Sequence, residues 1–366
     1  MGFRMASAAL NGICPYFTMF PLEFPLQVLR RRAKPHHAVL DPFCGRGTTN
    51  FAARLLGLRS LGVDSSPVAT AITAAKLVQV NAPDILTEAR DILTGTEPDD
   101  VPVGEFWEWA YHPGVLVELC RFRAALLNQC STPARIALRG IILGALHGPR
   151  QKTFQSYFSN QSPRTYAPKP AYATRYWKAR KLRPLRVDVL DVIERRANRY
   201  YRSLSNGEGE VRLCDSRESG SLMPKAKDRR FSWVITSPPY YGMRTYIPDQ
   251  WLRYWFVGGS DCVDYTNERQ IAHSSADNFT ADLRKVWNNV AKACESDARL
   301  VVRFGGISDR RADPLELAKA SFVGGAWRLA TRLGAGTALD GKRQADAFLR
   351  NRSKPIVEYD LWARLA

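Results

Sequence analysis

Residues 236–240 read Thr-Ser-Pro-Pro-Tyr and directly follow the apolar run 231–235. The run predicts a buried strand, and the two prolines must end it, because proline has no N–H to donate to a ladder. Past a strand end, such a rigid loop can aim a hydroxyl, a backbone carbonyl and an aromatic ring at one flat polar group. A proline-rich surface turn is the alternative interpretation. The candidate catalytic residues are Ser237, Pro238, Pro239 and Tyr240.

A second group of residues that could bind a ligand lies at 38–49. An apolar run ends in Asp41, and Gly45 and Gly47 then permit a tight turn before a helix that starts near Thr48. The turn lacks the third glycine of the dinucleotide fingerprint and the lysine of a phosphate-binding loop. An acid at this strand end therefore favours a ligand with a positive charge.

The next apolar run, 59–63, ends in Asp64, about twenty residues past the glycine turn. An acid at this offset commonly binds ribose hydroxyls in Rossmann-like sheets. The alternative is an N-cap for the helix from Pro67, but Ser65 or Ser66 can fill that role instead. We therefore expect Asp64 to contact a ribose.

The elements that must position these residues are strands alternating with helices, a pattern typical of an open α/β sheet. Ligands of such sheets bind outside the carboxyl ends of the strands, where both groups of residues fall. Further strands are expected at 211–215, 297–304 and 356–362, and a helix packed on the sheet at 278–294. Helical spacing also appears at 114–129, 134–147 and 187–204.

Residues 41–49 and 236–240 together resemble the cofactor and catalytic motifs of the DNA amino-methyltransferases. These enzymes transfer a methyl group from S-adenosylmethionine to N4 of cytosine or N6 of adenine. The resemblance covers residues 15–80 and 210–365, and it implies a Rossmann-like class I methyltransferase sheet with helices on both faces. The cofactor-binding residues that it implies are Phe20, Pro21, Asp41, Pro42, Phe43, Cys44, Gly45, Gly47, Thr48, Asp64, Ser65 and Asp215.

The order of the parts departs from the common arrangements of this family. A long, partly helical insertion falls between the second and third predicted strands, and Asp91 within it competes with Asp215 for the adenine of the cofactor. Asp215 is preferred because 211–214 has strand character. We expect a cofactor-binding half at 15–80, an inserted target-recognition region at 81–208 and a catalytic half at 209–366.

The composition favours a polyanionic partner. Lys and Arg number 53 against 35 Asp and Glu in 366 residues, a net charge of +18. No apolar run approaches the roughly 18 residues of a membrane span and no signal peptide opens the chain. Seven cysteines without a C-x-x-C pair argue against disulfides or a zinc site, and the histidines show no metal-ligand spacing. We expect a cytoplasmic protein with DNA as partner.

The segment 150–186 carries ten basic residues, no acidic ones and several aromatic rings. Basic side chains neutralise phosphates and rings stack on unpaired bases, so we expect nucleic-acid contact from a largely extended segment. A well-packed structural loop is the alternative. Part of a Gly-rich, basic stretch at 324–350 is expected to form a loop that faces DNA. The predicted nucleic-acid contacts are Arg164, Lys169, Arg175, Tyr176, Trp177, Lys178, Arg180, Lys181 and Arg244.

The resemblance also implies a mechanism. Ser237 Oγ and the Pro238 carbonyl accept hydrogen bonds from the target amine, and Tyr240 stacks on a base that has left the duplex. Serine in the first motif position favours cytosine N4, with adenine N6 as the alternative. An RNA methyltransferase and a non-catalytic DNA-binding subunit on the same fold are further alternatives. A cognate endonuclease or other defence-system protein is an expected partner.

Overall fold

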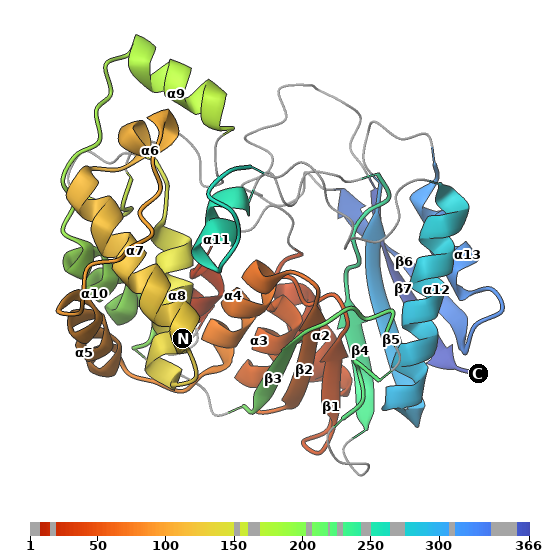
Figure 1. The fold of residues 1–366 in the computed structure, drawn as a ribbon. Coiled ribbons are helices and arrows are strands. Elements are labelled where there is room, and N and C mark those ends of the chain that lie inside the picture. The colour runs from red at the N-terminus through yellow and green to blue at the C-terminus, as the bar shows by residue number, and fades with distance from the viewer. Residues whose placement is uncertain are drawn as a thin grey trace. The chain divides into compact units, whose positions relative to one another are not determined.

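The chain forms two compact units, whose elements are labelled in Figure 1. The helical unit comprises residues 1–16, 74–204 and 245–267, and the sheet unit comprises residues 17–73, 205–244 and 268–366. The computed structural model describes residues 8–14, 20–149, 154–159, 169–202, 207–218, 220–224, 230–242, 250–263, 275–306, 312–337 and 357–366.

One seven-stranded sheet organises the sheet unit. Its strands are β1 (Ala38–Asp41), β2 (Arg59–Asp64), β3 (Gly209–Leu213), β4 (Phe231–Thr236), β5 (Cys294–Gly305), β6 (Trp327–Thr337) and β7 (Val357–Leu365). Their order is β3-β2-β1-β4-β5-β7-β6. Strands β1 to β5 pair in parallel, and β7 is antiparallel to both neighbours. This is the predicted Rossmann-like class I methyltransferase sheet.

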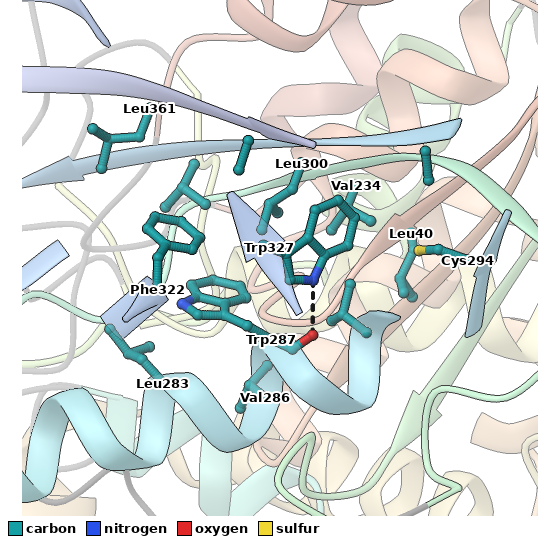
Figure 2. Close-up of a cluster of buried hydrophobic side chains, with 14 of the residues drawn as sticks. Leu40, Val234, Leu283, Val286, Trp287, Cys294, Leu300, Phe322, Trp327 and Leu361 are labelled. Carbon is teal, nitrogen blue, oxygen red and sulfur yellow. Dashed lines mark hydrogen bonds between the residues drawn. The ribbon is translucent and has the colours of Figure 1, made fainter. Parts of the chain in front are cut away.

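One face of the sheet packs against α12 (Ala276–Ala293) and α13 (Pro314–Phe322). Because strand side chains alternate between faces, Leu40, Val234 and Leu300 all point to this side. Trp287 of α12 is buried among them, and its carbonyl accepts a hydrogen bond of 2.9 Å from Trp327 Nε1 (Figure 2). This cluster is the main hydrophobic core of the sheet unit.

The opposite face carries α2 (Glu23–Arg32) and α3 (Thr48–Leu55). Arg303 lies between two core residues of β5, so its side chain points away from that core, and its guanidinium stands over the ring of Phe24 at 3.9 Å. Thr49 Oγ1 donates to the Ile235 carbonyl at 3.0 Å and fixes α3 to β4. Helices therefore cover both faces, as predicted. A further helix, α4 (Pro67–Leu77), follows β2.

The helical unit contains a short 3-10 helix, η1, and seven α-helices among its described residues. They are η1 (Ala9–Gly12), α5 (Ala82–Leu93), α6 (Glu105–Ala110), α7 (Pro113–Asn128), α8 (Pro133–Ala145), α9 (Pro170–Ala179), α10 (Val189–Tyr200) and α11 (Trp251–Phe256). Side chains of Asn81, Thr132 and Asp188 cap α5, α8 and α10 by accepting backbone N–H groups. The rings of Trp107 and Trp255 meet at 4.6 Å and tie α6 to α11.

Three segments bear on the sequence-based expectations. Strand β6 occupies 327–337 of the Gly-rich, basic stretch 324–350, part of which is expected to form a loop, and residues 338–350 lie outside the described residues. Helix α9 replaces the extended conformation expected near 170–179, because proline is well tolerated in the first turn of a helix. Asp91, the less favoured candidate for the adenine of the cofactor, lies in helix α5.

The insertion between the second and third strands is confirmed, since α5 to α10 all lie between β2 and β3 along the chain. Among the described residues, no helix combines the length and apolar character that a membrane span requires.

Candidate active site

The two motif regions meet where the order of the strands reverses. The chain proceeds from β1 to β2 on one side, whereas β4 pairs with the other side of β1 and leads to β5. In an open α/β sheet this switch point is the usual ligand site, at the carboxyl ends of the strands. Asp41 ends β1 and Thr236 ends β4, and Thr236 Oγ1 donates a hydrogen bond of 2.6 Å to Asp41 Oδ1. The motifs are thus in direct contact.

The Asp41 carboxylate is fully buried, and only one of its two oxygens accepts hydrogen bonds from described residues. Its Oδ1 also accepts the Phe43 N–H at 3.1 Å, whereas Oδ2 has no hydrogen-bond partner among the described residues. Burial raises the pKa of Asp41 to about 7, although the Thr236 and Phe43 hydrogen bonds act in the opposite direction. A buried carboxylate oxygen without a partner is well suited to a cationic ligand group.

The glycine turn that follows Asp41 needs its glycines for conformation and for space. Gly45 and Gly47 have φ of 50° and 73°, in the left-handed region. A Cβ on Gly47 would lie 2.6 Å from Thr73 Oγ1, and that hydroxyl donates to the Gly45 carbonyl at 3.0 Å. The turn is therefore held closely against α4.

Asp64 braces the same turn from the end of β2. One carboxylate oxygen accepts the Gly45 N–H and the other accepts the Ser66 N–H, each at 2.9 Å. Burial raises the pKa of Asp64 above its ordinary value. Ser66 caps α4, since its Oγ accepts the Ala69 N–H at 3.3 Å, and Ser65 is exposed beside it. The capping role thus falls to Ser66, and Asp64 keeps lone pairs for a ligand.

The other predicted cofactor residues of this region lie in the turn itself or at the start of α3. Cys44 is buried, and burial raises the pKa of its thiol, so the sulfur remains protonated. The Pro42 carbonyl accepts a hydrogen bond of 2.6 Å from Ser216 Oγ. Phe43 packs edge-on against Trp287 at 6.1 Å. Thr48 is buried in the first turn of α3.

Phe20 and Pro21 lie just before α2. The rings of Phe20 and Phe24 meet edge-on at 5.6 Å, so Phe20 is anchored to the helix that covers this face of the sheet. Pro21 is exposed. The rest of the predicted segment before them, residues 17–19, lies outside the described residues.

Asp215 follows β3 and is paired with an arginine. Arg217 binds it through two nitrogens, at 2.6 and 3.0 Å, and reaches Asp282 of α12 at 2.8 Å. Although partial burial opposes it, pairing with Arg217 lowers the pKa of Asp215 below its ordinary value. Asp215 thus lies at the carboxyl end of the sheet, whereas its competitor Asp91 is an exposed residue of α5.

The Ser-Pro-Pro-Tyr loop begins directly after the Asp41 contact. Pro238 is buried, and Ser237, Pro239 and Tyr240 are half-buried. The Tyr240 hydroxyl donates to Glu358 Oε1 at 2.8 Å, and its ring packs edge-on against Phe304 at 5.4 Å. Glu358 was not singled out from sequence. The available signal was weak, because the expected strand 356–362 carries two acids, Glu358 and Asp360.

The predicted nucleic-acid residues that are described lie on and around α9, in the helical unit. Lys169, Arg175, Lys178, Arg180 and Lys181 are all exposed. Lys178 is ion-paired with Glu105. Trp177 is 1% exposed and packs against Phe106 of α6, so it offers no open ring face. Arg164 and Arg244 lie outside the described residues.

A stack of side chains runs along the exposed surface of α9. The Arg180 guanidinium stands over the Tyr176 ring at 3.9 Å, and the Tyr172 ring stacks on Tyr176 at 6.4 Å. Tyr172 is 58% exposed. It belongs to the segment whose rings were expected to stack on bases, although it was not among the predicted contact residues. The i, i+4 spacing of the two tyrosines was the signal for it. We name this surface the α9 stack: Tyr172, Arg175, Tyr176, Arg180 and Lys181.

The strand order and the paired motifs define a class I methyltransferase fold. Residues 7–75 match the N6_N4_Mtase family model, described as DNA methylase. This stretch contains the Asp41 turn and Asp64, and the match confirms the resemblance to DNA amino-methyltransferases.

Similar proteins include a Type II methyltransferase, M.MjaII, from Methanocaldococcus jannaschii, which is 28% identical over 96 residues. That alignment covers 26% of this chain and 18% of the relative, so the chain matches less than a fifth of the relative's length. Among solved structures, the rRNA methyltransferase aviRa from Streptomyces viridochromogenes aligns over 99% of this chain and 93% of its own, with 14% identity and a TM-score of 0.37. A SAM-dependent methyltransferase from Methanosarcina mazei aligns over 95% and 98%, with 8% identity and a TM-score of 0.36.

Proposed function

We propose that the protein is an S-adenosylmethionine-dependent DNA methyltransferase that modifies an exocyclic amine of a base. Cytosine N4 is the preferred candidate for that amine. The observation that carries this proposal is the hydrogen bond between Thr236 and Asp41. It joins the catalytic loop to the cofactor turn at the switch point of the sheet, so a methyl donor and an amine acceptor can meet there.

The residues at the switch point fit the cofactor. The unpartnered Asp41 Oδ2 suits its positive charge, and the left-handed glycines permit close backbone approach. Asp64 ends β2 and keeps lone pairs for ribose hydroxyls. When bound, S-adenosylmethionine supplies an electrophilic methyl group on a sulfonium. Phe20 and Asp215 are proposed to line the methionine and adenine ends.

The residues of the catalytic loop would activate the amine. The lone pair of an exocyclic amine is delocalised into the ring, so the amine is a poor nucleophile. Ser237 Oγ and the Pro238 carbonyl would accept hydrogen bonds from its two N–H groups and so make the lone pair available. Tyr240 would stack on the base and hold it in place, and such positioning contributes several kcal/mol to catalysis. Fixed dipoles then stabilise the charge that develops on nitrogen.

The α9 stack is proposed to contact the nucleic acid. A base must leave the duplex to reach a pocket of this kind. Exposed rings can stack on unpaired bases, and Arg175 and Lys181 can neutralise phosphates. The net charge of +18 supports a polyanionic substrate. A cognate endonuclease stays a prediction.

Adenine N6 is the second candidate target, because both amines present the same pair of hydrogens to Ser237 and Pro238. RNA is a further candidate substrate, since stacking and phosphate contacts serve both nucleic acids. A non-catalytic subunit has no use for an acceptor loop in contact with Asp41, and this contact favours the enzyme.

Mass spectrometry of host DNA tests the proposal. The chain is expressed in a host without amino-methyltransferases, and the digested DNA is searched for N4-methylcytosine and N6-methyladenine. The Ser237→Ala variant is the control and should leave the DNA unmodified. DNA without either base, from cells that contain folded protein, would refute the proposed activity.

A further inference from the structure

The last residues of β5 and the first of β7 form a close-fitting seat for the Tyr240 ring. Gly305 and Glu358 are direct cross-strand partners in the antiparallel pair. A Cβ on Gly305 would lie 3.2 Å from Tyr240 Cε2 and 3.0 Å from Glu358 Cγ. A side chain at this position would therefore press on both groups. Phe304, the neighbour of Gly305, meets the ring edge-on.

The seat also fixes the hydroxyl end of the ring. Glu358 is 2% exposed, and its Oε1 accepts the Tyr240 hydroxyl at 2.8 Å. A hydrogen bond to a carboxylate is stronger than one between neutral groups. The two contacts constrain different parts of the side chain, because ring atoms Cε2 and Cζ lie close to Gly305 while the hydroxyl is held by Glu358. Together they set both side-chain torsions of Tyr240.

We infer that Glu358 is a positioning residue for methyl transfer and that Gly305 provides the space that the Tyr240 ring needs. The inference rests on the proposed function, in which Tyr240 stacks on the target base. Glu358 touches neither base nor cofactor in this role. It acts through the tyrosine hydroxyl, and it keeps the ring plane ready before the base arrives. Preorganisation of this kind matters because small misplacements of reacting groups are costly.

A double-mutant cycle on Tyr240 and Glu358 tests this role. Glu358→Leu removes the acceptor at similar volume and should lower kcat about tenfold, the effect of one hydrogen bond, with unchanged cofactor affinity. Glu358→Gln keeps an acceptor oxygen and should regain most of the activity. In the Tyr240→Phe background, Glu358→Leu should cost little more, because the hydroxyl it serves is gone. Losses that multiply in the double variant would overturn the inference.

Tyr359→Phe is the matched control. It removes a phenol hydroxyl from the next residue of β7 and should leave kcat unchanged. Gly305→Ala provides an independent test, because its methyl group must push the ring aside by a few tenths of an ångström. It should lower kcat while cofactor affinity is kept.

NMR separates a failure of this inference from a failure of the proposed function. With tyrosine labelled at the ring carbon that bears oxygen, the Tyr240 resonance is assigned by its loss in Tyr240→Phe. Glu358→Leu should shift that resonance, whether or not the protein methylates DNA. An unshifted resonance contradicts the seat itself, whereas a shifted one in an inactive wild-type protein contradicts only the proposed activity.

Discussion

At the scale of single residues, Asp41 carries the strongest electrostatic argument. It is fully buried, one oxygen has no described partner, and its pKa is raised to about 7. In the cofactor-free protein the folded pKa exceeds the ordinary 3.8, so the protonated form is favoured by folding. That contribution to stability is therefore lost as the pH rises from 3.8 to about 7.

Cofactor binding should show the opposite pH dependence. If the ionised carboxylate binds the cationic cofactor, affinity should fall about tenfold for each pH unit below the pKa and level off above it. Titration calorimetry between pH 5.5 and 8.5, roughly one and a half units either side of that pKa, measures this. Asp41→Asn should bind weakly and lack this dependence, and so reveal any ionisation of the cofactor itself. A wild-type profile that matches the variant's would remove Asp41 from the site.

Thr236→Val tests how the two motifs are coupled. The Thr236 hydroxyl lowers the pKa of Asp41 by donating to it, so its removal should raise that pKa further. The midpoint of the cofactor-binding profile should move to higher pH, and the free energy of unfolding should fall by about 1 kcal/mol. An unchanged midpoint would show that this hydrogen bond does not tune Asp41.

At the scale of elements, the glycine turn and α9 show what sequence can predict. The turn follows from local rules, because two glycines after a strand readily adopt the left-handed backbone that a tight turn uses. Helix α9 was missed because its prolines suggested an extended chain, although Ala173, Thr174 and Trp177 lie at helical spacing and are buried. Tyr240 and Glu358 are 118 residues apart in the chain, and no local pattern predicts a contact between residues so far apart.

Gly47→Ala and Gly57→Ala separate backbone strain from steric fit. Both glycines have φ near 70°, so each alanine should cost about 1 kcal/mol of unfolding free energy. Only at Gly47 would the methyl group meet Thr73, and Gly57 has open space around it. Urea unfolding should therefore show the larger loss for Gly47→Ala, and calorimetry should show lost cofactor affinity for that variant alone. Equal losses of stability and affinity would contradict the close approach at Thr73.

The α9 stack gives a prediction about salt dependence. Arg175→Gln should weaken DNA binding and lower the slope of log affinity against log salt by about 1, since one phosphate contact is lost. Arg186→Gln removes the same charge, but Arg186 already pairs with Glu118 at 2.8 Å, so the slope should change less. Tyr172→Ala should weaken single-strand binding without a change in slope. Fluorescence anisotropy over a salt series measures all three, and equal slopes for the two arginine variants would argue against this surface.

At the scale of the whole molecule, the sheet was predictable and the division of the chain was not. Strands β1, β2, β4 and β5 carry apolar runs, and β3 and β7 mix apolar with polar residues. Strand β6 is mostly exposed, with Gly334 and Gly336 near its end and a weak pattern. The helical unit gathers residues 245–267 with 74–204, a grouping set by long-range packing of aromatic rings such as Trp107 on Trp255. Local patterns in the sequence do not predict which of these distant rings pack together.

Transfer of an isotopically labelled methyl group by the purified protein tests the proposed methylation directly. Wild type and Ser237→Ala are incubated with labelled S-adenosylmethionine and with DNA or RNA of the same sequence, and the nucleosides are separated. Wild type should place the label in N4-methylcytosine of DNA, and the variant should place none. Label confined to RNA, or label in DNA that survives Ser237→Ala, would contradict the proposed methylation.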